Sequence, residues 1–271
     1  MSKIILNSGY TMPQLGLGTW TMSDVAAARL TYEAICLGCR LIDTARMYHN
    51  EKGVGDGVRR AIAEGIVTRE EIFVTSKISP LEIRDPGQAL AEAYEKLGLA
   101  YIDLMLVHEP GPGALALYQT LEQGVAEGRI RFLGISNFYT PESFDHMAEA
   151  VRILPAVVQN EHHPYQQNTV LRAHLRQYGT ILEAWYPFGG RAHTREVLTD
   201  PAIVEIAAAH KASPAQIVLA WQMQSGCVTI PGTENSAHLQ ENLTAADITL
   251  APTEMQQIAA LDRKQSFENW Y

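Results

Sequence analysis

The stretch Leu41-Ile42-Asp43-Thr44-Ala45 is a short apolar run interrupted by a carboxylate, and Tyr48 follows it closely. Two later apolar runs also end at a polar side chain, the first at Lys77 and the second at His108. The three runs lie about 30 residues apart, which is the length that one strand and one returning helix occupy. In a parallel sheet the C-terminal ends of the strands share one face, so the four side chains are expected to converge there.

Strand and helix signals alternate along the rest of the chain. Short runs rich in Val, Ile and Leu predict strands at residues 15–18, 41–43, 72–77, 102–107, 131–135, 156–160, 180–185 and 227–230. Amphipathic stretches predict helices between them, at residues 24–37, 51–64, 86–97, 114–127, 141–150, 168–178 and 200–210. Further helices are predicted at residues 213–225, 235–242 and 253–262, and a β-hairpin at residues 4–13 precedes the first strand.

This order predicts an α/β fold, a (β/α)8 TIM barrel with an N-terminal β-hairpin and extra C-terminal helices. Since no interior linker rich in Pro, Gly or Ser divides the chain, residues 1–271 are expected to form a single domain. In the first helix, Ser23 is the expected N-cap. The expected buried face of that helix is formed by Val25, Ala28, Tyr32 and Ile35.

A doubly wound open sheet is the alternative architecture, but its nucleotide-binding fingerprint is absent. Residues 16–18 read Gly-Leu-Gly and are followed by Trp20 and Thr21 instead of the third glycine of that motif. The glycine-rich run at residues 53–57 falls at a predicted helix start and has no strand before it, so a phosphate loop is disfavoured there. The barrel is therefore the expected fold.

The composition indicates a globular protein that does not act on nucleic acids or membranes. Hydrophobic residues make up 46% and charged residues 19%, and the net charge is −9 with no basic block. Nucleic acid and anionic membrane surfaces are therefore poor candidate partners. No apolar stretch approaches the roughly 18–20 residues that span a bilayer, and the N-terminal apolar run is too short for a signal peptide.

The cysteines Cys36, Cys39 and Cys227 leave an odd count without a disulfide framework, which is typical of a reducing cytoplasm. Cys36 and Cys39 have CxxC spacing, but they fall at the predicted end of a helix and the sequence offers no second pair for zinc, so ordinary packing roles are expected for both. His162 and His163 have only one neighbouring glutamate as a further ligand. We expect no metal site.

The four converging side chains suit proton donation near neutral pH. A free phenol has a pKa near ~10 and an ammonium a few Å away stabilises the phenolate, so Lys77 is expected to lower the pKa of Tyr48. Asp43 would pair with Lys77 and offset the cost of burying an ammonium. His108 can hydrogen-bond a carbonyl oxygen and orient it. This set can protonate an alkoxide as it forms, but it contains no reductant.

Ordered motifs make the chain resemble the aldo-keto reductase family nearly from end to end, and in particular its monomeric bacterial-type aldehyde and ketone reductases. The matching segments are residues 13–20, residues 41–51, GISNF at residues 134–138, QNEHHP at residues 159–164, and a degraded IPGT at residues 230–233 followed by Glu241 and Asn242. The resemblance implies an oxidoreductase that reduces an aldehyde or ketone to the alcohol by hydride transfer from NAD(P)H. Tyr48 would be the general acid of a catalytic tetrad completed by Asp43, Lys77 and His108.

The resemblance also implies that the cofactor, NADP(H) or NAD(H), lies across the C-terminal face of the barrel. Ser136, Asn137 and Gln159 would hydrogen-bond its carboxamide through complementary donors and acceptors. Trp185 would stack on the nicotinamide ring, unless it is an ordinary core tryptophan. The other implied cofactor-binding residues are Thr19, Trp20, Asp43, Thr233, His238, Glu241 and Asn242.

Two departures from the family pattern bear on the cofactor. Gly232 stands where the family usually has a lysine, and His238 stands where it usually has an arginine. Those two cations bind the 2′-phosphate of NADPH, a dianion that prefers charge-assisted partners. We therefore expect a weakened preference for NADPH and appreciable use of NADH.

The expected substrate pocket is formed by Trp20, Tyr48, His108 and Glu109. Glu109 replaces the tryptophan that commonly follows the catalytic histidine, which exchanges an apolar wall for a carboxylate unless that side chain points to solvent. Polar or hydroxylated carbonyl compounds are therefore the expected substrates. The loop after Glu109 is short, which indicates an open pocket, and Trp270 and Tyr271 could cover its mouth or simply pack.

Two other functions stay open on the sequence. Lys77 could be the Schiff-base nucleophile of an aldolase-type enzyme, although Asp43 beside it would keep the amine charged. The chain could also be a nucleotide-binding redox-sensing protein with little turnover. The expected partner is a small-molecule carbonyl substrate, and the expected protein is a cytoplasmic monomer or weak dimer.

Overall fold

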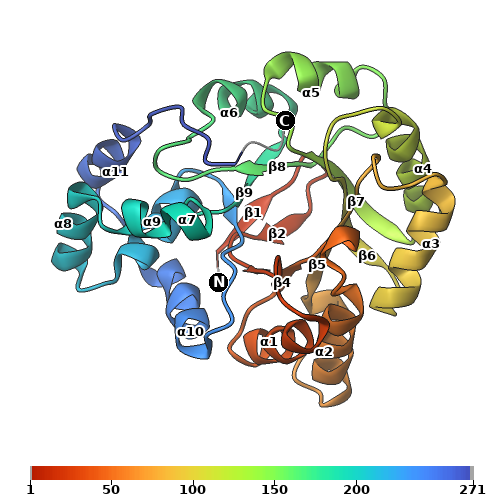
Figure 1. The fold of residues 1–271 in the computed structure, drawn as a ribbon, viewed down its shortest axis with the longest axis horizontal. Coiled ribbons are helices and arrows are strands. Elements are labelled where there is room, and N and C mark those ends of the chain that lie inside the picture. Colours follow the sequence, from red (N-terminus) through yellow and green to blue (C-terminus); the bar gives the residue numbers. More distant parts are fainter. Residues whose placement is uncertain (1, 269–271) are drawn as a thin grey trace.

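The computed structural model describes residues 2–268 and shows a closed ring of parallel strands surrounded by helices (Figure 1). The strands are β3 (Leu17–Gly18), β4 (Leu41–Asp43), β5 (Phe73–Ile78), β6 (Ile102–Val107), β7 (Ile130–Ser136), β8 (Val157–Glu161), β9 (Ile181–Trp185) and β10 (Val228–Thr229). Each pairs in parallel with the next, in the order β3 to β10 of one 8-stranded sheet. The expected (β/α)8 fold is confirmed.

Hydrogen bonds beyond the ends of the first and last strands close the ring. Thr229 N donates to Gln14 O at 2.8 Å, Gly16 N donates to Thr229 O at 3.0 Å, and Gly18 N donates to Pro231 O at 3.1 Å. These bonds leave the sheet without an exposed edge, which is how barrels avoid pairing with other chains. They also bring residues 230–233 beside the start of the chain.

The helices that surround the sheet follow the expected order. They are α1 (Asp24–Cys36), α2 (Glu51–Ala63), α3 (Pro86–Leu97), α4 (Ala114–Ala126), α5 (Pro141–Ala148), α6 (Thr169–Leu175), α7 (Gly190–Leu198), α8 (Pro201–His210), α9 (Pro214–Gln224), α10 (Ser236–Thr244) and α11 (Pro252–Ala259). Only α7 was not anticipated. Its sequence is short and mostly polar, and it starts after Gly189, whose φ of 79° lies in the left-handed region.

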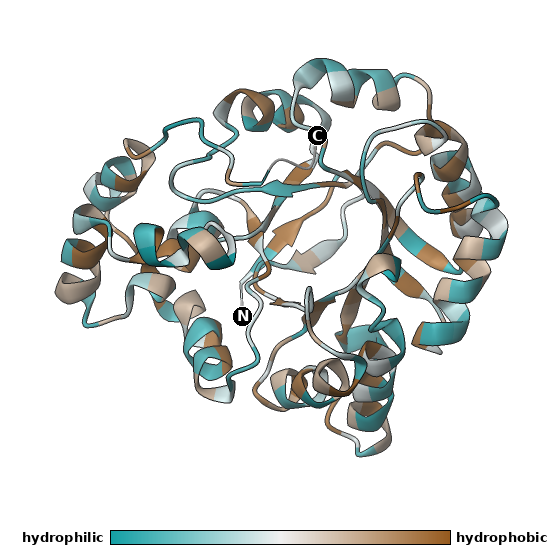
Figure 2. Cartoon of the chain, in the orientation of Figure 1, coloured by the Kyte–Doolittle hydropathy of each residue, from teal (hydrophilic) through white to brown (hydrophobic). Residues whose placement is uncertain are grey.

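The N-terminal hairpin covers the end of the barrel at which the parallel strands begin. It consists of β1 (Lys3–Ile5) and β2 (Thr11–Pro13), which pair antiparallel as expected. Met12 and Leu6 pack there against the apolar side chains of Leu41, Phe73, Leu104, Phe132 and Val228. Figure 2 shows hydrophobic residues along the central strands and hydrophilic residues over much of the helical ring. The opposite, C-terminal end of the barrel is therefore the end that can hold a ligand.

The expected buried face of α1 is partly wrong. Ser23 is the N-cap, as expected, but Val25 is 81% exposed. The buried residues are Ala27, Leu30, Thr31, Ala34 and Ile35. The expected face was chosen by its larger apolar residues. The helix is instead buried along small residues such as alanine, which let α1 approach α2 closely.

Glycines of α2 make this approach possible. A Cβ atom added to Gly53 would lie 2.0 Å from the carbonyl oxygen of Asp24, and one added to Gly57 would lie 2.7 Å from that of Ala28. The glycine-rich run at residues 53–57 therefore serves helix packing, and it lies inside α2 where no phosphate could reach its backbone.

Within residues 2–268, no helix is long and apolar enough to cross a membrane. The same described residues contain no group of three or more His, Cys, Asp or Glu side chains placed to hold a metal ion.

We expect Gly53→Ala to lower the free energy of unfolding by about 2 kcal/mol, because overpacking typically costs ~1–3 kcal/mol and exceeds the ~1 kcal/mol that alanine gains in helix propensity. Urea denaturation of the two proteins measures the difference. Gly87→Ala in the first turn of α3 is the control, because its added Cβ would meet only Asp85 Oδ1, at 3.3 Å. Equal stability of Gly53→Ala and the parent protein would contradict this account of the α1–α2 contact.

Candidate active site

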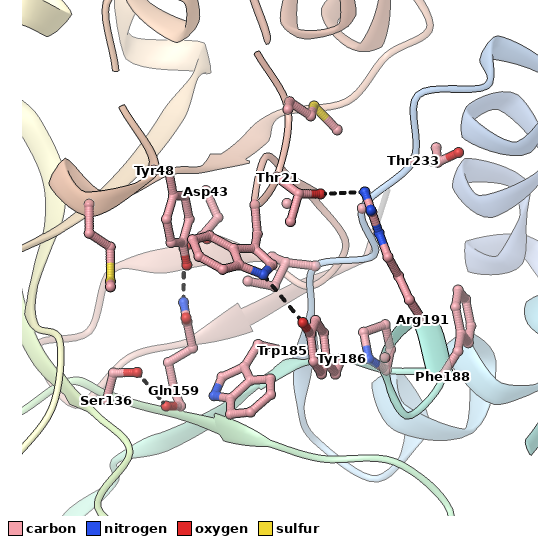
Figure 3. A pocket seen from close by; sticks show the side chains of 18 of the residues that line it. Thr21, Asp43, Tyr48, Ser136, Gln159, Trp185, Tyr186, Phe188, Arg191 and Thr233 are labelled. Carbon is pink, nitrogen blue, oxygen red and sulfur yellow. Dashed lines mark hydrogen bonds between the residues drawn. The ribbon is translucent and has the colours of Figure 1, made fainter. Parts of the chain in front are cut away.

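A cleft opens at the C-terminal end of the barrel, with an empty volume of about 1140 Å³ counted out to the solvent at its mouth (Figure 3). Most of the side chains expected from the sequence line it. These are Trp20, Asp43, Tyr48, His108, Glu109, Ser136, Asn137, Gln159, Trp185 and Thr233, together with the backbone of Gly232. Lys77 lies just beneath them and is fully buried.

Lys77 links three strand-end groups in the floor of the cleft. Its ammonium donates to Asp43 Oδ1 at 2.6 Å, to the carbonyl oxygen of Thr44 at 2.9 Å and to the Tyr48 hydroxyl at 3.1 Å. The phenol is brought into range by a single 3-10 turn, η1 (Arg46–Tyr48), which follows β4. All three ammonium hydrogens therefore have acceptors, which is what a buried lysine requires.

Burial acts against the ionised forms of both Lys77 and Tyr48, and charge pairing outweighs it only at Lys77. Burial alone would lower the pKa of Lys77, but the Asp43 carboxylate and Tyr48 outweigh it and hold that pKa above its usual value. Lys77 is therefore an ammonium at neutral pH. Burial raises the pKa of Tyr48 to about 12, although the Lys77 ammonium opposes this rise.

The expected lowering of the Tyr48 pKa is therefore wrong. The sequence showed the neighbouring cation but could not show how far the folded protein would enclose the phenol, which stays only partly exposed at the cleft. Tyr48 is consequently fully protonated at neutral pH, with its hydroxyl held by Lys77. A proton is available there for a base that approaches within the cleft.

The rings of His108 and Trp20 both lie close to the phenol ring of Tyr48. The ring centres of Tyr48 and His108 are 5.7 Å apart, and those of Tyr48 and Trp20 are 4.7 Å apart. Burial, together with the Lys77 charge, holds the pKa of His108 well below its usual value, so the imidazole is neutral. Its Nδ1 atom is buried and has no hydrogen-bond partner among residues 2–268.

Three polar side chains at the ends of β7 and β8 are already oriented by the protein. Ser136 Oγ donates to the carbonyl oxygen of Gln159 at 2.8 Å. Asn137 Nδ2 donates to the carbonyl oxygen of His108 at 2.9 Å, and Asn137 Oδ1 accepts from Trp185 Nε1 at 3.2 Å. Gln159 Nε2 donates to Asp43 Oδ2 at 2.8 Å. These bonds fix which atoms remain for a ligand.

The remaining atoms complement a primary carboxamide. Ser136 Oγ keeps its lone pairs, Gln159 Oε1 takes part in none of these bonds, and Asn137 Nδ2 has a second hydrogen. Two acceptors and one donor match the amide hydrogens and carbonyl oxygen of a carboxamide. The indole of Trp185, tethered by its bond to Asn137, lines the same cleft. The donor set therefore fits the nicotinamide end of a dinucleotide.

Several expected cofactor residues do not line the cleft. Thr19 is buried behind it, where its hydroxyl donates to the carbonyl oxygen of Asp43 at 2.8 Å. His238 and Glu241 lie on α10 outside the lining, as does the buried Asn242. Trp270 and Tyr271, considered above as a lid, lie outside the described residues.

Glu109 lines the cleft and accepts a hydrogen bond from the Ser79 hydroxyl. Its carboxylate is therefore part of the pocket wall.

The side chains after β9, which form one wall of the cleft, were not identified from the sequence. Tyr186, Phe188 and Arg191 line the cleft there, and Arg191 Nη2 donates to Thr21 Oγ1 at 2.7 Å. Figure 3 shows the guanidinium reaching from this wall toward Thr21. The Gly189-Gly190-Arg191 sequence after an apolar run was the available signal, because a glycine-rich loop after a barrel strand often binds a ligand.

A comparison with known families matches residues 13–263 to the model described as "Aldo/keto reductase family". The chain belongs to this family. The expected oxidoreductase class is thereby confirmed, and the Schiff-base and redox-sensor alternatives are not favoured.

Individual relatives cover almost the whole chain. The 9,11-endoperoxide prostaglandin H2 reductase of Trypanosoma cruzi is 39% identical over 96% of this chain and 91% of its own length. The NAD(P)H-dependent D-xylose reductase I,II of Candida tropicalis is 36% identical over 96% of this chain and 92% of its own. The crystal structure of a Bombyx mori aldo-keto reductase in complex with NADP has a TM-score of 0.91 at 31% identity, covering 99% of this chain and 95% of that one.

Removing one partner of the buried ion pair should destabilise the aldo-keto reductase fold. We expect Lys77→Met to lower the free energy of unfolding by about 3–5 kcal/mol, because it leaves the Asp43 carboxylate buried without its cation. Chemical denaturation at pH 7 measures this loss. The double variant Asp43→Asn/Lys77→Met has no buried unpaired carboxylate, so part of the stability should return. A double variant less stable than Lys77→Met would show that the argument is wrong.

Proposed function

We propose that this aldo-keto reductase reduces the carbonyl group of an aldehyde or ketone with NADH or NADPH, and that Tyr48 donates the proton. The observation that supports this proposal most directly is the combination, in one cleft, of a carboxamide-complementary donor set with a phenol held by a buried ammonium. Such a site has a place for a nicotinamide and a proton donor beside it.

The cofactor would be held by Ser136, Asn137 and Gln159 at its carboxamide and by the flat indole of Trp185. When bound, the reduced nicotinamide supplies the hydride that this chain's own side chains cannot supply. Arg191 adds a guanidinium to the cleft wall, and we propose that it attracts the phosphate groups of the dinucleotide.

The protein's own groups divide the acid chemistry between them. The neutral imidazole of His108 donates a hydrogen bond to the substrate carbonyl oxygen and directs it toward the Tyr48 hydroxyl. As negative charge develops on that oxygen, the Tyr48 proton moves to it, because an alkoxide is a far stronger base than a phenolate. Lys77 stabilises the resulting phenolate through the hydrogen bond it already makes, and Asp43 keeps Lys77 charged.

The same contacts argue against Lys77 as a Schiff-base nucleophile. A nucleophilic amine must be unprotonated. In this structure three acceptors surround the ammonium, and its pKa is raised by Asp43 and Tyr48.

We further propose a polar carbonyl substrate and appreciable use of NADH. Glu109 contributes a carboxylate to the cleft, while Trp20 and Tyr186 supply flat apolar walls joined by a hydrogen bond of 3.2 Å. Gly232 offers no cation at the cleft, and His238 is exposed and outside its lining. The 2′-phosphate of NADPH would therefore find fewer charged partners than the rest of the dinucleotide does.

We also propose that residues 1–271 form one barrel domain that works in the cytoplasm as a monomer or weak dimer. All three cysteines are free thiols, two of them buried, which supports a reducing compartment.

Tyr48→Phe should abolish most of the reductase activity. Loss of a general acid typically lowers the rate ~10²–10⁴-fold, so kcat for a small aldehyde should fall by about a thousandfold while cofactor binding changes little. Absorbance of the reduced cofactor measures the rate. Tyr178→Phe, whose hydroxyl contacts Asp145 on the surface, is the matched control. Carbonyl reduction by Tyr48→Phe at the rate of the parent enzyme would refute the proposed acid.

Gly232→Lys should restore a cation and raise the NADPH-to-NADH ratio of kcat/KM at least tenfold, since a charge-assisted contact to phosphate contributes ~1.5–3 kcal/mol. The new Cβ would lie 3.0 Å from the carbonyl oxygen of Gly18, so only a small shift is needed. Gly232→Ala is the control that adds the Cβ without the charge. A parent enzyme that already prefers NADPH by more than a thousandfold would contradict the proposed weakness of this contact.

A further inference from the structure

A second carboxyl group lies in the barrel interior beside the tetrad, and the acid chemistry above does not use it. Glu183 lies on β9 and is fully buried. Its Oε2 atom accepts a hydrogen bond from Gln159 Nε2 at 2.8 Å, and the same nitrogen donates to Asp43 Oδ2 at 2.8 Å. One amide group is thus shared between two carboxyl groups.

This sharing determines how the Gln159 amide is oriented. Both hydrogens of Nε2 are engaged inside the barrel, so Oε1 is the atom left for a ligand. The reversed amide would place Oε1 against the ionised Asp43, where two acceptors would repel each other. Without Glu183 one of the two internal acceptors would be lost, and the amide would be free to rotate away from the orientation that suits a carboxamide.

The charges in this part of the interior also need to balance. The charged groups that act on Glu183 are Asp43 from β4 and Lys77 from β5, while Gln159 from β8 is uncharged and β10 pairs with β9 through Val228 opposite Glu183. A single ammonium is already paired with Asp43. Burial, and after it the Asp43 charge, raise the pKa of Glu183 to about 8. Glu183 is therefore mostly a neutral acid at pH 7.

We propose that Glu183 is a positioning residue for carbonyl reduction: as a neutral acid it anchors the Gln159 amide, and its ionisation weakens the site. The inference rests on the proposed function. An ionised Glu183 would add a second negative charge beside Asp43, compete with Asp43 for the Gln159 hydrogens and make the Tyr48 phenolate harder to form. Carbonyl reduction should therefore slow as pH rises through the range in which Glu183 loses its proton.

The first test compares pH profiles. Between pH 7 and pH 9 we expect kcat/KM for reduction of a small aldehyde to fall at least threefold in the parent enzyme. Glu183→Gln keeps an acceptor for Gln159 but cannot ionise, so its profile should be flat over this range. Glu51→Gln is the matched control, because Glu51 is also a buried carboxyl with a raised pKa but bonds to Ser76 outside the cleft; its profile should follow the parent. Identical profiles for Glu183→Gln and the parent would overturn the proposal.

The second test measures the anchoring directly, without turnover. Tryptophan fluorescence reports dinucleotide binding through Trp20 and Trp185, which line the cleft. Glu183→Leu removes the acceptor and should raise the Kd about tenfold, while Glu183→Gln should stay within about twofold of the parent. Equal affinities in all three proteins would refute the anchoring role. If Glu183→Leu does not fold, the Glu183→Gln pH profile decides.

The third test separates this inference from the proposed function. The native protein holds a proton on Glu183 that the unfolded chain, with a glutamate pKa near ~4.3, has lost. The stability contributed by this proton is present at low pH and disappears as pH rises toward 8. The Tm of the parent should therefore fall relative to that of Glu183→Gln between pH 5 and pH 8, and parallel Tm curves would refute the neutral acid even if no carbonyl were reduced. A parent that neither binds a dinucleotide nor reduces aldehydes would instead overturn the proposed function.

Discussion

The burial of one ammonium inside the barrel is the constraint on which the site depends. Taking Lys77 out of water costs several kcal/mol, and only the acceptors supplied by Asp43, Thr44 and Tyr48 offset this cost. Those acceptors come from the end of β4 and the turn after it, while Lys77 comes from β5. Because Asp43 pairs with Thr75 across the two strands, a slip in register would move the carboxylate to the other face of the sheet. The ion pair and the strand register therefore stabilise each other.

Much of the fold and the centre of the site could be predicted from the sequence, because both follow from regular spacing. Parallel strands separated by helices have their C-terminal ends on one face, and this rule alone brought Asp43, Lys77 and His108 together. The rule gives no prediction for segments that lie outside the regular alternation of strands and helices. Helix α7 is short and mostly polar and starts at two glycines with positive φ, so neither the helix nor Arg191 was anticipated. The exposure of Val25 was missed because contacts made by alanine and glycine leave no hydrophobic pattern.

Electrostatic properties were harder to predict than positions. The sequence placed a cation beside the Tyr48 phenol, and a cation by itself lowers the pKa of a phenol. Burial acts in the opposite direction and is the larger effect, but it depends on side chains such as Trp20 and His108 that surround the ring only after folding. Glu183 escaped notice for a related reason. One glutamate within an apolar strand does not reveal whether it faces solvent or the barrel interior.

The charges in the floor of the cleft balance only if one of its two carboxyl groups keeps its proton. The floor of the cleft contains one ammonium and two carboxyl groups, and Gln159 bridges the carboxyl groups with a single amide. Two buried carboxylates with one cation would leave a net negative charge where the two groups are almost wholly removed from solvent. A proton on one of them removes that charge, and it belongs on Glu183 because Asp43 already has Lys77 as its partner. The neutral acid then accepts a hydrogen bond without competing for the cation, and the ammonium remains directed at the Tyr48 hydroxyl that it must stabilise.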